Sequence, residues 1–456
     1  MNYDSSMGLL EELREILGAQ ASLIVDPEIV SSYSRDQSQL ATHGNPKLVL
    51  LAKSELEVSK TLKFANSQKI PVVARGAGSG LSGGANAVSG GIVISLEKMN
   101  QVLEIDEVNQ LARVEPGVIN LDLDKEVSKL NLAYLPDPAS REWSTIGGNV
   151  ATNAGGMCCV KYGVTANHVR AIRLVMADGE VITVGNPLKK SVTNLDLLHL
   201  IVGSEGTLGI VTEIVVSLAP RPKPATTLIA TFAGIDSAMK TIPELVALGP
   251  SMLEVVDETT LRAVEEWKPL GFEGVGTVLI MQSDDSAEIC ASGAAIAAKH
   301  GAIDVTYSDD PRDSSDLIQV RKLAYPALER KGVALLDDVC VPISKISNLI
   351  SKVKEISEQS NLLIGIFGHA GDGNMHPTIV YDHGDKGAEQ RAQRAFNSII
   401  KVAQELGGTA SGEHGIGSIK VEAARSESGE RIIELQRAIK QIFDPNGILN
   451  PGKKIP

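Results

Sequence analysis

Ten glycine-rich residues, RGAGSGLSGG (75–84), directly follow the strand-like run PVVA. Gly78, Gly80 and Gly83 satisfy the GxGxxG spacing of a dinucleotide-binding turn, and Glu97 stands about where its acidic partner would be. That turn requires a helix directly after the glycines, because the helix N-terminus meets the pyrophosphate. Only residues 84–91 lie between Gly83 and the apolar part, IVISL, of the next strand-like run, and they include further glycines. The pattern excludes a Rossmann turn, and NAD is not expected.

A loop between two strands with many bare N–H groups can bind a phosphate or pyrophosphate without a helix, although a plain flexible loop is the alternative. A second glycine cluster, STIGGNVATNAGG (144–156), favours the first interpretation. It sets glycines beside amide and hydroxyl side chains, which suit a ligand with many hydrogen-bonding edges. Two such loops indicate a large cofactor.

A chain of 456 residues is too long to fold around one hydrophobic core, so two or three domains are expected. Hydrophobic residues at 43% and charged residues at 22% are typical of a fully folded protein. The net charge of −13 gives no positive electrostatic field that would attract a phosphate backbone, so nucleic acid is not an expected partner. The acidic N-terminus does not resemble a signal peptide, and no apolar run reaches the length of a membrane span. We expect a cytoplasmic protein, peripheral to the inner face of a membrane only through partners.

Redox chemistry in this chain must come from a bound organic cofactor or from a partner. The cysteines Cys158, Cys159, Cys290 and Cys340 have no CxxC spacing and are too few for an iron–sulfur cluster or a disulfide scaffold. Reduced thiols are the expected state.

Short β-branched runs alternate with glycine-rich loops and a few helices between Leu48 and Leu218, which predicts an α+β domain. Pro220, Pro222 and Pro224 interrupt the pattern and predict a linker. Beyond it, strand-like TTLIATFAG, VGTVLIMQS and AIDVTYS alternate with helix-like IDSAMKTIPELVAL and AEICASGAAIAAKH, as in a second α+β domain. Residues 386–406 predict a long helix ended by Gly407 and Gly408.

Two histidines flank a predicted hairpin turn in LLIGIFGHAGDGNMHPTIVY. Asp372-Gly373 is a dipeptide favoured in two-residue type I′ turns. Counting back from this turn pairs Gly371 with Asn374, Ala370 with Met375, and His369 with His376. Directly paired residues share a face with Cβ atoms roughly 4.5–5.5 Å apart, which would bring two imidazoles to one ion.

A third candidate motif, SGEHGIG, adds Glu413 and His414 on a glycine-flanked loop. Two histidines and one glutamate form the ligand set of many catalytic zinc sites, although a lone histidine in a strand is usually structural. About forty residues separate the loop from the hairpin, so spacing alone cannot show that they meet. A metal-dependent hydrolase is a rival interpretation, but it leaves both glycine clusters unexplained.

The motifs RGAGSGLSGG, LPDPAS, STIGGNVATNAGG, YG and GSEGTLGIVTE resemble the FAD-binding domain of the vanillyl-alcohol oxidase and p-cresol methylhydroxylase superfamily. The resemblance covers nearly the whole chain. It implies a PCMH-type FAD-binding domain of two subdomains (1–221) and an α+β substrate or cap domain with an antiparallel sheet (222–405). A C-terminal helical segment (406–456) is expected to return to the FAD-binding domain and close the active site.

The resemblance implies FAD held by the first loop around the pyrophosphate and by later segments around the rest. Ser79 fills the slot where some members link flavin through a histidine, so non-covalent FAD is expected. The implied cofactor residues are Arg75, Gly76, Ala77, Gly78, Ser79, Gly80, Leu81, Ser82, Pro136, Asp137, Thr145, Gly147, Gly148, Asn149, Thr152, Ala154, Gly155, Gly163, Glu205, Gly209, Ile210, Val211 and Asn450.

Within the superfamily, HAGDGNMH and GEH are similar to the metal motifs of the D-2-hydroxy acid dehydrogenase branch. That similarity implies His369, His376 and Glu413 as ligands of a divalent ion, zinc first, with manganese or ferrous iron as alternatives. It implies His414 as the base that takes the hydroxyl proton while flavin N5 accepts the hydride. Arg321 is the implied partner of the substrate carboxylate, with Tyr325 one helical turn later as a wall or hydrogen bonder.

The implied activity is FAD-dependent oxidation of a small D-2-hydroxy acid to the 2-oxo acid. Tyr325, Leu336 and Thr378 stand where the D-2-hydroxyglutarate dehydrogenase branch has polar or basic residues, which favours a lactate- or glycolate-like acid over 2-hydroxyglutarate. A flavin-binding subunit of a glycolate oxidase-type complex, with iron–sulfur and second flavin subunits, is a further alternative. An inactive subunit fits less well, because the His, His, Glu and His positions are retained. A single-chain dehydrogenase with another acceptor fits the residues equally.

Overall fold

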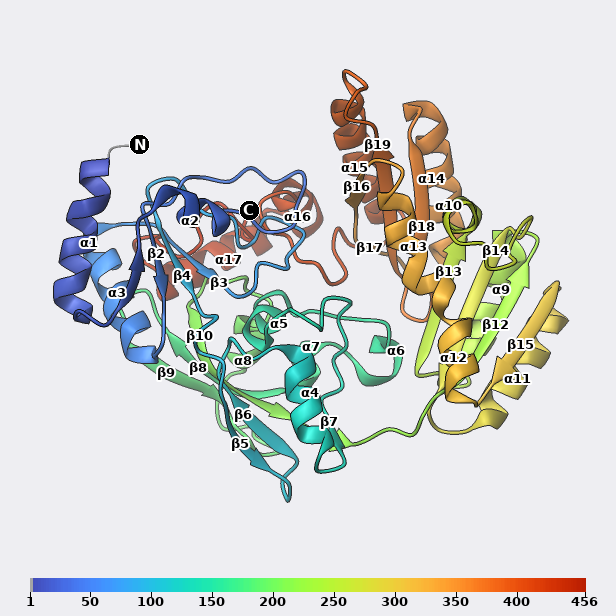
Figure 1. Cartoon of the computed structure of the whole chain (residues 1–456), viewed down its shortest axis with the longest axis horizontal. Coiled ribbons are helices and arrows are strands. Elements are labelled where there is room, and N and C mark those ends of the chain that lie inside the picture. The colour runs from blue at the N-terminus through green and yellow to red at the C-terminus, as the bar shows by residue number, and fades with distance from the viewer. Residues whose placement is uncertain (1–2) are drawn as a thin grey trace. The chain divides into compact units, whose positions relative to one another are not determined.

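The computed structural model describes residues 3–456, and the chain divides into two compact units. The first unit contains the chain up to Gly155 together with residues 164–221 and 414–456, and the second contains residues 156–163 and 222–413. Figure 1 labels the helices and strands of both units. The domain limits 1–221, 222–405 and 406–456 remain predictions, and residues 1 and 2 of the first range lie outside the described residues.

A four-stranded sheet in the order β1-β2-β4-β3 forms one half of the first unit. Strands β2 and β3 run parallel to β4, and β1 is antiparallel to β2. The strands β2 and β4 read LVLL and IVIS and are almost wholly buried, as parallel strands covered on both faces usually are. The strand bounds are Ser22–Ile24 (β1), Leu48–Leu51 (β2), Val72–Arg75 (β3) and Ile92–Ser95 (β4).

Two helices cover this sheet, α1 (Tyr3–Leu17) and α3 (Glu55–Gln68). Leu13 of α1 and Leu62 of α3 are fully buried in the same hydrophobic cluster. In the described segment 76–91, between β3 and β4, no helix forms, which confirms that the glycine loop is not a Rossmann turn.

The second sheet of this unit is antiparallel, in the order β5-β6-β10-β8-β9. Strand β10 alternates buried and half-buried residues, so one face of the sheet forms a core with Val114, Ile172 and Ile214. The bounds are Val102–Asp106 (β5), Leu111–Val114 (β6), Val169–Val175 (β8), Val181–Gly185 (β9) and Ile210–Ser217 (β10), with β7 (Leu132–Ala133) paired to β11 (Ala219–Pro220).

The C-terminal segment returns to the first unit. Leu449 forms an isolated parallel bridge with Val72 of β3, and the Asn450 N–H donates to the Val72 carbonyl (2.8 Å). Ile448 and Leu449 are buried in the same cluster as α1 and α3. The last residues thus complete the edge of a sheet that begins near the N-terminus.

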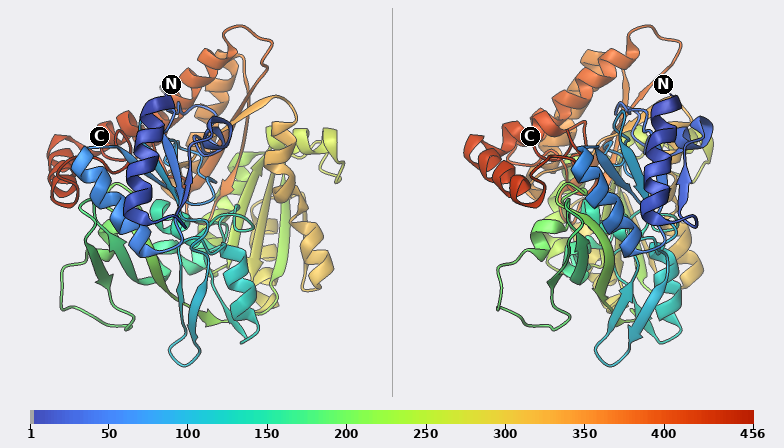
Figure 2. Two further views of the ribbon diagram at one scale, coloured as in Figure 1. Left: turned by 60° about the vertical axis from the view of Figure 1, so that its left-hand side comes forward. Right: turned by 90° about the vertical axis from the view of Figure 1, so that its left-hand side faces the viewer.

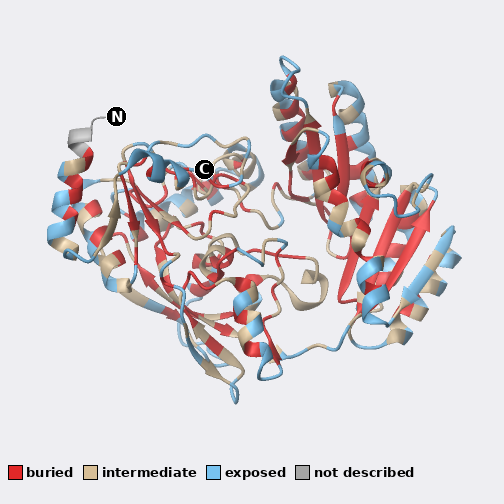
Figure 3. Ribbon diagram, viewed as in Figure 1, coloured by how far each residue is buried: buried red, intermediate tan, exposed pale blue. Residues whose placement is uncertain are grey.

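The second unit contains one antiparallel sheet in the order β15-β12-β14-β13-β18-β19-β16, with β17 also paired to β19. Its central strands are the most buried elements in this unit (Figure 3). The bounds are Thr226–Phe232 (β12), Met252–Asp257 (β13), Thr277–Ser283 (β14), Asp304–Ser308 (β15), Val333–Leu336 (β16), Val339–Cys340 (β17), Leu363–His369 (β18) and Asn374–Tyr381 (β19).

Helices cover the sheet of the second unit, and those expected from the sequence are confirmed. Helices α9 (Ile235–Val246) and α11 (Ala287–Lys299) pack against β12 and β14. Helices α14 (Ile346–Ser360) and α15 (Ala388–Glu405) lie side by side over β18 and β19 (Figure 2). The α+β prediction with an antiparallel sheet in the second unit is therefore confirmed.

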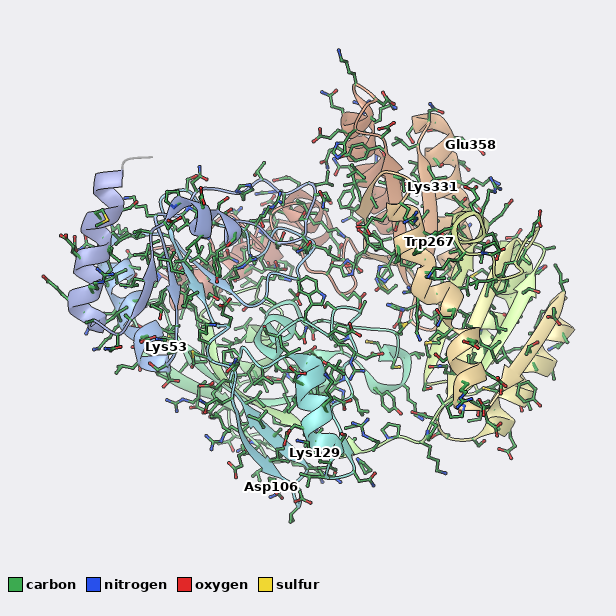
Figure 4. All side chains as sticks on the ribbon, in the orientation of Figure 1. Lys53, Asp106, Lys129, Trp267, Lys331 and Glu358 are labelled. Atoms are coloured by element: carbon green, nitrogen blue, oxygen red, sulfur yellow. The ribbon has the colours of Figure 1, made fainter. Side chains whose placement is uncertain are left out.

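Helices α10 (Glu258–Trp267) and α13 (Gln319–Glu329) pack together on the sheet, over Val256 and Phe367. Trp267, at the end of α10, is labelled in Figure 4. The centre of its ring lies 4.8 Å from the Lys268 ammonium and 4.9 Å from the Arg330 guanidinium. These two helices position the side chains described below.

The remaining helices are short or peripheral. They are α2 (Pro27–Ser32), α4 (Asn120–Ser128), α5 (Ile146–Thr152), α6 (Cys159–Tyr162), α7 (Thr165–His168), α8 (Leu198–Ile201), α12 (Pro311–Leu317), α16 (Val421–Ser428), α17 (Glu430–Phe443) and a 3₁₀ turn, η1 (Ile343–Lys345). Within residues 3–456, no helix combines the length and the apolar character needed to cross a membrane.

Candidate active site

The structure brings the two glycine clusters of the first unit together. An added Cβ at Gly76 would lie 2.4 Å from Thr145 Oγ1 and 3.8 Å from Gly148 Cα, so a side chain at this position would clash with the Thr145 hydroxyl. Thr145 caps α5 by accepting a hydrogen bond from the Gly148 N–H (3.1 Å). The second cluster is thereby folded into a short helix beside the first loop.

A cavity with about 490 Å³ of empty space, including its open mouth, runs between these clusters and β10. Its lining contains eight of the predicted cofactor residues: Arg75, Gly76, Thr145, Gly147, Gly148, Gly209, Ile210 and Val211. Sequence reasoning missed Pro116, Ile201, Ser204 and Gly206, which also line it and stand outside the quoted glycine clusters.

The loop itself offers unpaired donors. Among the described residues, none accepts a hydrogen bond from the backbone N–H groups of residues 76–82. The loop is held from behind instead, since the Gln37 N–H donates to the Gly80 carbonyl (2.9 Å) and buried Arg75 donates to the Arg35 carbonyl (2.9 Å). Consecutive free N–H groups next to a glycine-lined cavity can bind the oxygens of a pyrophosphate.

Two predicted cofactor residues, Glu205 and Asn450, hold protein backbone. The Glu205 carboxylate accepts from the Ile416 and Gly417 N–H groups (2.7 Å each). Asn450 Nδ2 donates to the carbonyls of Gly84 (2.9 Å) and Glu205 (2.6 Å). Both residues therefore fix the loop after His414 and the C-terminal tail against the glycine loop.

The other predicted cofactor residues occupy varied positions. Asn149 is buried and forms hydrogen bonds with Asn120 (3.2 Å) and Ser144 (3.3 Å). The Thr152 hydroxyl donates to the Gly148 carbonyl (3.3 Å). Gly163 belongs to the second unit. Ala77, Gly78, Ser79, Gly80, Leu81 and Ser82 form the loop, while Pro136, Asp137, Ala154 and Gly155 lie in the first unit outside the lining of the cavity.

Substitution of Gly417 by alanine is expected to destabilise the loop that follows His414 strongly. Its φ of +51° already disfavours a side chain by roughly 1–2 kcal/mol, and an added Cβ would lie 1.9 Å from the Ser82 carbonyl oxygen. Gly447 (φ +66°) has nothing within 4 Å of such a Cβ, so Gly447→Ala is the matched control. Thermal unfolding should show a much larger loss for Gly417→Ala, and equal losses would contradict this account.

The register of the histidine hairpin differs from the prediction. His369 pairs with Asn374, Gly368 with Met375, and Phe367 with His376, so the predicted pairs of Gly371, Ala370 and His369 are wrong. The loop has four residues, 370–373, because the N–H groups of Asp372 (3.3 Å) and Gly373 (2.9 Å) both donate to the His369 carbonyl. The Gly371 N–H also donates to Leu253 of β13 (3.1 Å), which ties the loop to the neighbouring strand and excludes a two-residue turn.

The two imidazoles still converge, because His369 and His376 are diagonal neighbours on one sheet face. Their Nε2 atoms are 3.3 Å apart, and Glu413 Oε1 lies 3.6 Å from the first and 3.4 Å from the second. Ligands about 2.0–2.2 Å from one ion at tetrahedral angles would be separated by roughly 3.3–3.6 Å. Two imidazole nitrogens and one carboxylate oxygen at these separations fit a divalent ion such as zinc.

Asp338, which sequence reasoning missed, brings Glu413 to the hairpin. Its fully buried carboxylate accepts from Asn374 Nδ2 (2.7 Å), Ser411 Oγ (2.6 Å) and the Glu413 N–H (3.1 Å). It thereby joins β19 to the loop that carries Glu413. The only sequence signal was a charged pair, DD, directly after the apolar run VALL.

A second missed carboxylate, Glu254, connects His369 with the predicted carboxylate-binding residue Arg321. Glu254 Oε1 lies 2.6 Å from His369 Nδ1, and Oε2 accepts from Arg321 Nε (2.5 Å). Burial alone would lower the pKa of His369, but the charges of Glu254 and Glu413 outweigh it and raise that pKa well above its usual value. The Arg321 guanidinium lies 4.6 Å from the centre of the Phe367 ring.

The remaining predicted catalytic residues are placed as follows. Tyr325 is half-buried, and its hydroxyl points to Glu329 (3.5 Å); burial raises its pKa to about 12. His414 directly follows Glu413 and is the first residue of the C-terminal part of the first unit. The Ser82 hydroxyl donates to the His414 carbonyl (3.0 Å), so the backbone at His414 is anchored to the glycine loop.

The fold and the glycine-lined cavity define a flavoprotein oxidoreductase. The chain belongs to the FAD-linked oxidase family: residues 221–454 match the model "FAD linked oxidases, C-terminal domain", and residues 46–185 match "FAD binding domain". The recognised family and the prediction of an FAD-linked enzyme are confirmed, and the FAD-binding domain supports FAD as its cofactor.

Among relatives, the chain is 39% identical to "Glycolate oxidase subunit GlcD" of Bacillus subtilis, over 90% of this chain and 88% of that protein. It is 35% identical to "D-lactate dehydrogenase" of Anaerostipes hadrus, over 98% of this chain and 96% of that protein. Among solved structures, 4-ethylphenol oxidase from Gulosibacter chungangensis has a TM-score of 0.79 at 21% identity, covering 99% of this chain and 97% of that chain. Substrate-bound p-cresol methylhydroxylase has the same TM-score and coverage at 17% identity. The structural matches show the shared fold, the PCMH type.

Proposed function

We propose that this chain oxidises a small D-2-hydroxy acid, lactate- or glycolate-like, to the corresponding 2-oxo acid, with non-covalent FAD and one divalent metal. The observation that carries the proposal is the convergence of His369, His376 and Glu413, with donor atoms 3.3–3.6 Å apart, in a family that binds FAD. Names of two relatives, a glycolate oxidase subunit and a D-lactate dehydrogenase, support the substrate class.

FAD would be held by the first unit, with the unpaired N–H groups of residues 76–82 at its pyrophosphate and the cavity residues along the remainder. When bound, FAD supplies the acceptor for the two electrons that leave the substrate carbon. Ser79 cannot form the histidine linkage, so the cofactor should dissociate on denaturation. We propose residues 1–221 as the FAD-binding domain, residues 222–405 as the substrate or cap domain, and residues 406–456 as a C-terminal segment that packs on the FAD-binding domain and closes the active site.

The metal would be held by His369, His376 and Glu413, and zinc fits this donor set best. When bound, the ion supplies Lewis acidity that makes a neighbouring hydroxyl easier to deprotonate. His414 accepts the hydroxyl proton. Arg321 donates a forked pair of hydrogen bonds to the substrate carboxylate. Tyr325, Leu336 and Thr378 are uncharged, so these three positions provide no cation for a second carboxylate.

Two kinds of partner could accept the electrons from reduced FAD. The relative from Bacillus subtilis is named as a glycolate oxidase subunit, which supports assembly into a complex with other subunits. We propose iron–sulfur and second flavin subunits as these partners. A small soluble or membrane-borne acceptor is the alternative. We propose a cytoplasmic location, at the membrane only through such partners.

Anaerobic reduction of the bound flavin tests the proposal. Purified protein should be yellow, and one acid among D- and L-lactate, D- and L-2-hydroxybutyrate, D- and L-2-hydroxyglutarate and glycolate should bleach it. After removal of the metal by a chelator, bleaching should stop, and added zinc or manganese should restore it. Protein that stays colourless after reconstitution with FAD would refute the flavin assignment. Full bleaching after verified metal removal would refute the metal.

A further inference from the structure

Glu254 lies at the centre of the sheet in the second unit, where its side chain is fully buried. It sits on β13 directly opposite His369 of β18, so both side chains project from the same face. A buried carboxylate is costly unless it is paired, and both Glu254 oxygens are paired, one with His369 Nδ1 and one with Arg321 Nε. One carboxylate thus contacts two residues of different expected function.

The contact with His369 determines which ring nitrogen carries the proton. In the neutral ring that a metal ion requires, a carboxylate 2.6 Å from Nδ1 holds the proton on Nδ1, so the lone pair is on Nε2. Nε2 is the atom that faces His376 Nε2 and Glu413 Oε1. Glu254 therefore presents His369 in the tautomer that a metal ion requires.

The contact with Arg321 fixes the orientation of the guanidinium plane. Among the described residues, Glu254 is the acceptor recorded for Arg321, and it engages only Nε. The guanidinium also lies over Phe367, whose ring centre is 5.8 Å from that of His376. The two terminal NH₂ groups, which form the other edge of the fork, remain available for an anion.

We propose that Glu254 is a positioning residue that couples metal binding to recognition of the substrate carboxylate. The inference rests on the proposed function, since it assigns the metal to His369 and the carboxylate to Arg321. Because one side chain orients both groups, its loss should weaken both affinities together. A purely structural role would instead lower stability and leave the two affinities unchanged.

Glu254→Gln tests the coupling, because the glutamine amide has the same shape but one acceptor oxygen for two donors. In FAD-loaded, metal-free protein, zinc affinity measured against a competing chelator should fall about 10–100-fold. The KM of the acid that bleaches the flavin should rise about tenfold or more at saturating zinc, with FAD content unchanged. Glu258→Gln is the matched control, because Glu258 is exposed and pairs only with Arg262 (2.9 Å).

The outcomes separate this inference from the proposed function. Wild-type protein that does not bind zinc refutes the proposed metal site, whatever the variant does. Wild-type protein that binds zinc, with Glu254→Gln unchanged in zinc affinity or in KM, refutes the coupling. If Glu254→Gln does not fold, Glu254→Asp retains the charge but is too short to contact both partners, and the same two losses are expected. Glu254→Asp with both affinities of the wild type would also overturn the proposal.

Discussion

Replacement of His376 by alanine is expected to lower kcat/KM by about 10³-fold and to abolish zinc binding, with FAD retained. His376 lies on β19 with its side chain almost wholly buried, and its Nε2 is within 3.4 Å of both other proposed ligands. A divalent ion held here would supply several kcal/mol of charge stabilisation to the transition state, and about 4 kcal/mol corresponds to a factor of 10³. Steady-state dye reduction, metal analysis and the visible spectrum measure the three quantities.

His383→Ala is the matched control for this substitution. His383 lies two residues after the end of β19 and is exposed, and the centre of its ring is 6.1 Å from that of the Tyr381 ring. It should retain zinc, FAD and activity. A His376→Ala protein that keeps stoichiometric zinc, or that keeps wild-type activity without zinc, would contradict the assigned ligand set.

His414→Ala is expected to slow reduction of the flavin by about 10²–10⁴-fold while zinc and FAD remain bound. The substitution removes the proposed proton acceptor but leaves the backbone anchors of the loop, Ser82 to the His414 carbonyl and Glu205 to the Ile416 and Gly417 N–H groups. Stopped-flow measurement of flavin bleaching under anaerobic conditions gives the rate directly. Partial rescue by added imidazole would identify the missing group as a base.

Glu413→Gln distinguishes this effect from loss of the metal. Its side chain is one of the proposed ligands, so zinc content should fall in Glu413→Gln but not in His414→Ala. Flavin reduction at the wild-type rate in His414→Ala would remove the role of His414 as the base. Loss of zinc from His414→Ala would show that the residue acts on the metal instead of on the substrate proton.

The sequence was sufficient for the architecture because local signals determine it. The apolar runs LVLL and IVIS predict buried strands. The short interval from the glycine loop to Ile92 leaves no room for a helix. Gly407, after a long helical pattern, predicts where that helix ends. The predicted register of the hairpin is wrong because a contact with a neighbouring strand shapes its loop. Asp372-Gly373 favours a two-residue turn locally, but the hydrogen bond from Gly371 to Leu253 requires two more residues in the loop.

The supporting carboxylates could not be predicted because strand pairing places them. Glu254 interrupts the apolar run MLEVVD, and the local pattern therefore predicts a solvent-facing side chain. In the structure its strand is central in the sheet and its side chain is fully buried. Asp338 meets Glu413 across an interval of 75 residues. Such contacts depend on sheet order, and sheet order is a long-range property of the chain.

The bridge between Val72 and Leu449 bears on how the protein is made. A strand near the start of the chain receives its edge partner 377 positions later, after the whole second unit has been synthesised. At about 5–20 residues per second, that interval lasts roughly 20–75 s on the ribosome. During this time the β3 edge lacks its partner, so the nascent chain carries an unfinished core until Ile448 and Leu449 have been made.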